Sequence, residues 1–146
     1  MLIVARYVFV WTTKPNQPHF SAGSYKVIDV VDAFQLVLQP TDLSEQYLVR
    51  ILGVKSISDD TMLRKKAHDF INTLCRNRIV RVELDRRRID EDQMLLAHIY
   101  VDGRLLSADL VRHRFAKKSI LESDSKVVTK KLVEAEEQAA TRISSS

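Results

Sequence analysis

The sequence has few of the residues that build cross-linked, metal-bound or phosphate-loop sites. Only one of its 146 residues is a cysteine, which excludes an intramolecular disulfide and a cysteine-based metal cluster. Three glycines are too few for a glycine-rich phosphate loop, and the four histidines lack the HxH or HExxH spacing of metal motifs. The one apolar run, residues 1–11, is too short to span a bilayer. We therefore expect no cofactor, no metal and no membrane partner.

The residues that are present suit one compact domain, since 45% of them are hydrophobic. The net charge of +4 comes from the middle of the chain, because residues 61–120 carry 14 Lys and Arg against 8 Asp and Glu. A basic middle fits a nucleic-acid partner, and it equally fits an ordinary solvated surface. Cys75 falls among apolar residues at helical spacing, which predicts a small buried side chain. An unpaired cysteine is compatible with an intracellular location, cytoplasmic or nuclear.

The chain divides into an extension, a domain and a short tail. Residues 1–11 are rich in β-branched and aromatic side chains and predict a strand, with a short interfacial segment as the lesser alternative. Two prolines and Gly23 predict a loop up to residue 24. The domain is expected over residues 25–142, and the serine-rich end, residues 143–146, is expected to fray.

Within the domain, short strands alternate with turns and a helix lies midway. Patterns predict a helix over 60–76 with N-cap oxygens in Ser58-Asp59-Asp60, a second helix from Ser107 to about Phe115, and a third over 124–142. The expected strands are 25–31, 34–38, 46–54, 79–84 and 95–101, with a turn at Asp102-Gly103. This order favours an α+β, mainly β, fold, with an OB-type barrel among several options.

Five segments, in this order along the chain, resemble the staphylococcal-nuclease-like family. They are VIDVVDAFQLVL, LVRILGVKSIS, IVRVELD, LLAHIYVDGRLLSADLVRHRFA and VEAEEQAATRISSS. The fourth is the closest, beside the family's LAYVYVDG strand and following helix, whereas the last lacks the family's usual tryptophan. The resemblance implies a five-stranded OB-fold barrel with three helices over residues 25–142, to which the N-terminal strand is an addition.

The family's nuclease activity rests on calcium held by carboxylates, on two arginines that stabilise phosphoryl charge, and on an acid that orients water. At the positions of the two metal-binding aspartates this chain has Phe34 and Lys55, and Ser58 replaces the acid. Arg50 keeps one arginine, whereas Met94 replaces the other. The resemblance therefore implies a pseudo-nuclease that is not an enzyme.

Two functional hypotheses follow from a barrel without its chemistry. The first is a protein-interaction or scaffold module in a larger, possibly RNA-associated assembly, similar to the degenerate domains of Tudor-nuclease proteins. The second is binding of RNA or single-stranded DNA on a basic barrel face, through Arg50, Arg81, Arg86, Arg87 and Arg88. Asp90-Glu91-Asp92 directly follows the three adjacent arginines, which favours a solvated, self-compensated loop there. A residual metal-dependent nuclease is a minor third alternative.

Overall fold

The computed structural model describes residues 20–120 and 124–145, with side chains up to Thr141. The predicted strand in residues 1–11 lies outside the described residues. Five strands form a closed barrel: β1 Gly23–Asp32, β2 Gln35–Pro40, β3 Tyr47–Ile51, β5 Ile79–Glu83 and β6 Leu95–Val101. They are ordered β3-β2-β1-β5-β6, and β3 closes the barrel by pairing in parallel with β6. The predicted OB-type barrel is confirmed.

β1 is the strand that bends the sheet into a barrel. Its register against β2 shifts between Val27 and Asp29 and again between Val30 and Asp32. Such bulges kink a strand and increase its twist. β1 can therefore pair with β2 along its length while its first residues, Gly23–Lys26, also pair with β5.

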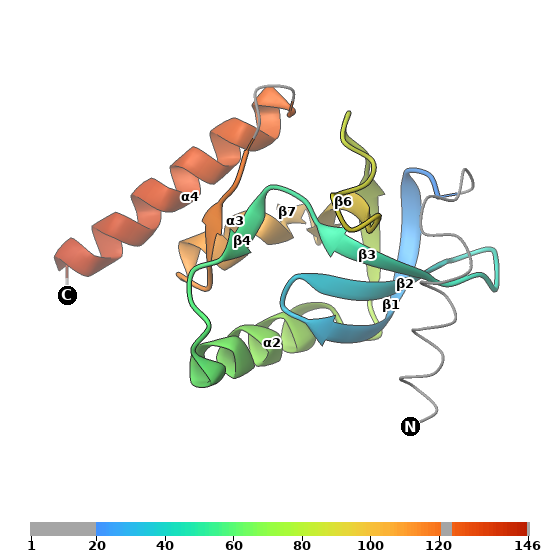
Figure 1. Cartoon of the computed structure of the whole chain (residues 1–146), viewed down its shortest axis with the longest axis horizontal. Coiled ribbons are helices and arrows are strands. Elements are labelled where there is room, and N and C mark those ends of the chain that lie inside the picture. The colour runs from blue at the N-terminus through green and yellow to red at the C-terminus, as the bar shows by residue number, and fades with distance from the viewer. Residues whose placement is uncertain (1–19, 121–123, 146) are drawn as a thin grey trace.

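Among the described residues, three helices surround the barrel, as expected: α2 Thr61–Cys75, α3 Leu106–Arg112 and α4 Lys126–Ser145. Figure 1 shows α2 below β1 and β2, and α4 on the opposite side of the barrel. The helix faces that meet the core are apolar, with Ala67, Ile71 and Cys75 buried in α2, and Val128, Leu132, Ala135 and Ala139 buried in α4. Asp60 is the N-cap of α2, since its Oδ1 accepts the N–H of Met62 at 3.0 Å.

The strand predicted over residues 46–54 is wrong as a single element. A turn at Leu52-Gly53 divides it into β3 and the short β4 Val54–Ser56, which leaves the barrel and pairs with β8 Ala116–Lys118. Gly53 has φ of +95°, a conformation that glycine adopts without strain. A continuous apolar run concealed this turn, because Leu52 and Val54 are both buried.

The ends of α3 and α4 also differ from prediction, and α3 ends at Arg112 rather than at about Phe115. α3 begins at Leu106 after the two-residue strand β7 Arg104–Leu105, and its N-cap, Leu105, makes no side-chain cap. Ser107, the predicted start, is instead buried within the first turn, because Leu105 and Leu106 are drawn into the core. α4 continues to Ser145 rather than ending at residue 142, since no glycine or proline follows to terminate it. Most of the predicted tail is thus helical.

Candidate functional site

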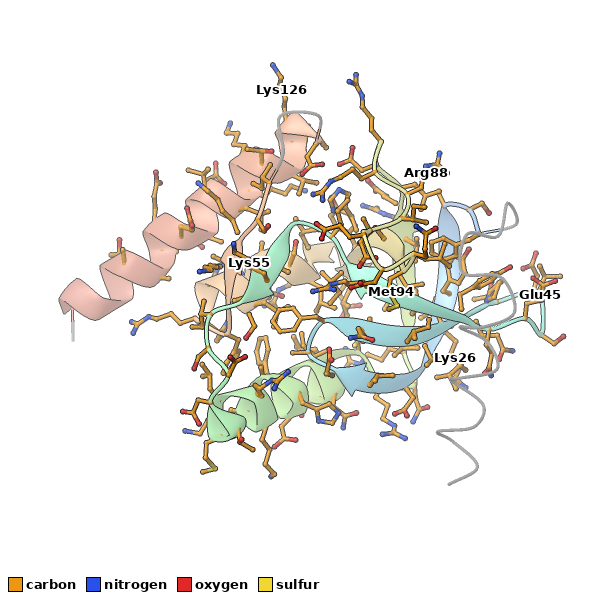
Figure 2. All side chains as sticks on the ribbon, viewed as in Figure 1. Lys26, Glu45, Lys55, Arg88, Met94 and Lys126 are labelled. Atoms are coloured by element: carbon orange, nitrogen blue, oxygen red, sulfur yellow. The ribbon has the colours of Figure 1, made fainter. Side chains whose placement is uncertain are left out.

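The main candidate site is a cavity of about 450 Å³ between the β3–β4 turn and the loop of residues 84–94 that joins β5 to β6. We call it the first cavity. Its charged side chains are three cations and three carboxylates: Arg50, Lys55, Arg87, Asp90, Glu91 and Asp92. Figure 2 labels Lys55 on β4, and Arg88 and Met94 on the 84–94 loop. The first cavity therefore has balanced charge rather than a surplus of positive charge.

Arg50, the predicted retained arginine, already has an anionic partner. Its Nη1 lies 3.4 Å from Oδ2 of Asp90. The other oxygen of Asp90 accepts the N–H groups of Asp92 at 2.8 Å and Met94 at 2.9 Å. Asp90 thus holds the turn of its own loop and neutralises Arg50, and both of its oxygens are engaged.

Arg87 ties the same loop to the start of α4. Its Nε and Nη2 donate to the two carboxylate oxygens of Asp124 at 2.9 and 2.8 Å, in the bidentate geometry that favours arginine. The Asp124 side chain is only 4% exposed. Hydrogen bonds to Asp124 raise the pKa of Arg87 against the opposing effect of burial. Arg87 therefore acts as a structural cation at one wall of the first cavity.

A buried carboxylate, Asp85, forms a second tie between this loop, β6 and α4. Its Oδ2 lies 2.8 Å from Nε2 of His98 and accepts the N–H of Ser125 at 2.9 Å, while Oδ1 accepts the N–H of Arg86 at 2.7 Å. Burial by itself raises the pKa of Asp85, but the hydrogen bonds from His98, Ser125 and Arg86, with the charge of His98, outweigh it and lower that pKa.

The lowered pKa of Asp85 predicts acid sensitivity. A carboxyl group whose pKa is lower in the folded state stabilises the fold above its unfolded-state pKa, and this contribution is lost as the pH falls through the folded-state value. We expect the free energy of unfolding to fall below about pH 4, and to fall less steeply in Asp85→Asn, which cannot titrate there. Urea titrations of both proteins between neutral and acidic pH measure this difference. Parallel curves would contradict the assignment.

The residues at the predicted metal positions do not fit calcium. Phe34 is half-buried and packs against the hydrophobic core. Lys55 lines the first cavity, and its ammonium group has no acceptor atom with which to ligate a cation. Ser58 Oγ accepts the N–H of Asp60 at 3.0 Å before α2, and Asp32 binds the N–H of Phe34 at 2.7 Å as part of the β1–β2 turn. Among the described residues, no three His, Cys, Asp or Glu side chains form a group that could hold a metal ion.

The structure brings together only part of the predicted basic face. Arg50 and Arg87 line the first cavity, and Arg86 and Arg88 are exposed on the adjoining loop. Arg81 lies elsewhere, on β5, with its Nη2 2.8 Å from Glu83 Oε2 and its guanidinium 4.5 Å from the centre of the Tyr100 ring. Tyr100 lies on the side of the barrel that α4 covers, because Lys131 of α4 also approaches the Tyr100 ring.

Sequence reasoning missed the carboxylates that organise this site. Asp124 was not considered, because it lies 37 residues from Arg87 along the chain. The sequence did suggest that acids would neutralise the arginine cluster, but Asp90 pairs with Arg50 and Asp124 with Arg87. His98 stands where the family's LAYVYVDG strand has a tyrosine, and its bond to Asp85 shows how the two residues fit. Only the density of charges in residues 85–92 could have signalled such pairing.

The chain was compared with protein-family models and with curated proteins. A family model described as "Staphylococcal nuclease homologue" matches residues 49–144, which run from β3 into the end of α4 and make up more than half of the chain. No curated protein matches the chain. β1 and β2 precede the matched range but complete the same barrel. Within the described parts of the chain, no helix has the length and apolar character needed to cross a bilayer.

Proposed function

Because the chain belongs to the staphylococcal nuclease homologues, we propose that it is a non-catalytic member whose barrel serves as a protein-interaction module in a larger, possibly RNA-associated assembly. The observation that carries this proposal is the ion pair between Arg50 and Asp90. In a working nuclease the arginine at this position would bind a phosphate, whereas here Arg50 is paired with the carboxylate of Asp90.

The electrostatics of the first cavity support the same proposal. Stabilising the charge of a phosphoryl transition state requires donors and cations that are not already neutralised. Here Asp90, Glu91 and Asp92 balance the three cations, so a phosphodiester would meet no surplus of positive charge. The hard oxygen ligands that calcium prefers are replaced by the ring of Phe34 and the ammonium of Lys55. A protein surface with mixed charge is the better match for this cavity.

Binding of RNA or single-stranded DNA is the second candidate, and one observation favours it. Arg86 and Arg88 are exposed, and within the described residues their guanidinium groups make no ion pair. Phosphate contacts by such side chains release counterions and make the affinity depend steeply on salt. Arg50 and Arg87 contribute less to this candidate, because each already has a carboxylate partner.

Labelled single-stranded RNA tests both candidates. We expect no cleavage with calcium, and no binding that depends on residues Arg86 and Arg88. Should RNA bind through them, Arg86→Ala/Arg88→Ala would lower the slope of log K against log salt by roughly 1.4, which is about 0.7 for each lost phosphate contact. Arg64→Ala/Lys66→Ala is the matched control, since it removes two exposed cations of α2 that have no ion pair in the described structure.

The outcomes separate the candidates. Cleavage that requires calcium and is abolished by a chelator would refute the non-catalytic assignment. A lowered salt slope in Arg86→Ala/Arg88→Ala, with an unchanged slope in the α2 control, would replace the protein-interaction proposal by nucleic-acid binding. Absence of both cleavage and binding supports the interaction module.

A further inference from the structure

A second cavity, of about 340 Å³, lies between β7, α3 and α4. It shares no lining residue with the first cavity. Its charged side chains are three cations and two carboxylates: Arg104, Arg112, Lys131, Asp109 and Glu134. Unlike the first cavity, the second therefore has a surplus of one positive charge.

Asp109 holds the two arginines of this cavity in place. Its side chain is 4% exposed, and its Oδ1 accepts hydrogen bonds from Arg104 Nη2 at 2.9 Å and from Arg112 Nη1. Arg112 is fixed further by its Nε, which donates to Gln138 Oε1 of α4 at 2.5 Å. Both guanidinium groups are thus oriented before any ligand arrives, so a ligand need not bear the full entropic cost of ordering them.

Donors remain free on these cations. A guanidinium group has five N–H donors, and Arg104, whose side chain is 57% exposed, uses one of them for Asp109. The ammonium of Lys131 makes no ion pair within the described residues. It lies 5.0 Å from the centre of the Tyr100 ring, beside which Arg81 also lies. An anion entering the second cavity would meet the unused N–H donors of Arg104 and the ammonium of Lys131. Glu134 also lines the cavity, and with it counted the surplus remains one positive charge.

We propose that the second cavity binds a carboxylate group of an acidic segment in a partner protein. One carboxylate matches the surplus of one positive charge, and a carboxylate can accept two parallel N–H bonds from a guanidinium fork. A nucleic-acid strand fits less well, because backbone binding requires a track of cations along several phosphates. This inference rests on the proposed function as an interaction module and names the chemistry of the partner.

Short peptides observed by NMR test the second cavity in the intact chain. The probes are acetyl-GSESG-amide, which carries a side-chain carboxylate, acetyl-GSQSG-amide, which carries none, and acetyl-GSQSG with a free C-terminal carboxylate. We expect the glutamate peptide to shift the Nε–H signals of Arg104 and Arg112 with a Kd in roughly the millimolar range. The amide peptide should leave these signals unchanged. The third peptide shows whether a chain terminus serves as well as a side chain.

Two substitutions locate the binding. Arg104→Gln and Lys131→Gln are expected to weaken binding of the glutamate peptide by about fivefold or more, because each removes a charge-assisted contact. Arg64→Gln on α2 is the matched control and should leave the affinity unchanged. Equal shifts with the glutamate and amide peptides, or an unchanged affinity in both Arg104→Gln and Lys131→Gln, would overturn the proposal.

The outcome is independent of the RNA experiment. If RNA is cleaved while the glutamate peptide still shifts the Arg104 signal, the proposed function fails and the carboxylate site stands. If RNA is neither cleaved nor bound and the glutamate peptide causes no shift, the carboxylate site alone fails. A short RNA that shifts the same signals more strongly than the peptide would also overturn the assignment to an acidic protein segment.

Discussion

Replacing Asp85 by alanine is expected to lower the free energy of unfolding by about 3 kcal/mol. The Asp85 side chain is buried, and its loss leaves the ring of His98, itself 4% exposed, without the partner of its Nε2. Nδ1 of His98 already lacks a partner within the described structure, so the variant would bury an imidazole with no hydrogen bond. The N–H of Ser125 would lose its acceptor as well. Urea unfolding followed by circular dichroism measures the change.

Two further variants separate this network from a general effect of the loop. Asp92→Ala removes an exposed carboxylate from the same loop and should change stability by less than about 0.5 kcal/mol. Asp85→Ala/His98→Phe removes both partners, so it should be less destabilised than the sum of the single variants by roughly 1 kcal/mol or more. Additive effects, or a loss in Asp85→Ala no larger than in Asp92→Ala, would show that the contact between Asp85 and His98 contributes little.

Asp85 also connects stability to the first cavity. In the 84–94 loop, Asp90 pairs with Arg50 and Arg87 lines the cavity. Asp85 and Arg87 attach the first half of this loop to the start of α4. The balanced charge of the first cavity therefore depends on contacts that lie outside the cavity. Loss of Asp85 would free the loop more than it would change the barrel, whose strands pair independently of this carboxylate.

The sequence predicted best those elements whose signals are local. The helix expected over residues 60–76 is observed at Thr61–Cys75, because both its cap at Asp60 and its apolar spacing are contained in one short segment. The barrel also followed from the order of motifs, of which LLAHIYVDGRLL is the most specific. β6, within that motif, is buried along its whole length and pairs with three other strands, so few other sequences would satisfy its surroundings.

What the sequence did not predict depends on distant partners. Asp109 lies in a segment that was interpreted only as a helix. Its role appears once Arg104 and Arg112 are seen to share one of its oxygens. Arg81 was predicted to share one basic barrel face with Arg50. Pairing of β5 with β6 instead sets Arg81 opposite Tyr100, whose ring Lys131 also approaches. Charge pairing across a closed barrel leaves no periodic signal in the chain.

Leu132→Ala is expected to lower the free energy of unfolding by about 3 kcal/mol, since it removes a fully buried leucine and leaves a cavity. Leu132 joins α4 to the barrel at the β3–β4 turn, where its Cδ1 would lie 3.1 Å from a Cβ placed on Gly53. Truncating this side chain therefore leaves part of the resulting cavity beside the β3–β4 turn. Thermal and urea unfolding measure the loss.

Val127→Ala is the matched control for this substitution, because Val127 belongs to the same helix but is 64% exposed. It should change stability by less than about 0.5 kcal/mol, and the higher helix propensity of alanine offsets part of that change.

Leu132 also adjoins Lys131 in sequence, and α4 supplies Lys131 and Gln138 to the second cavity. Leu132→Ala should loosen α4 and therefore bind the glutamate peptide more weakly. Val127→Ala should bind the peptide with unchanged affinity. Equal stability of the two variants would mean that α4 is not an integral part of the folded barrel.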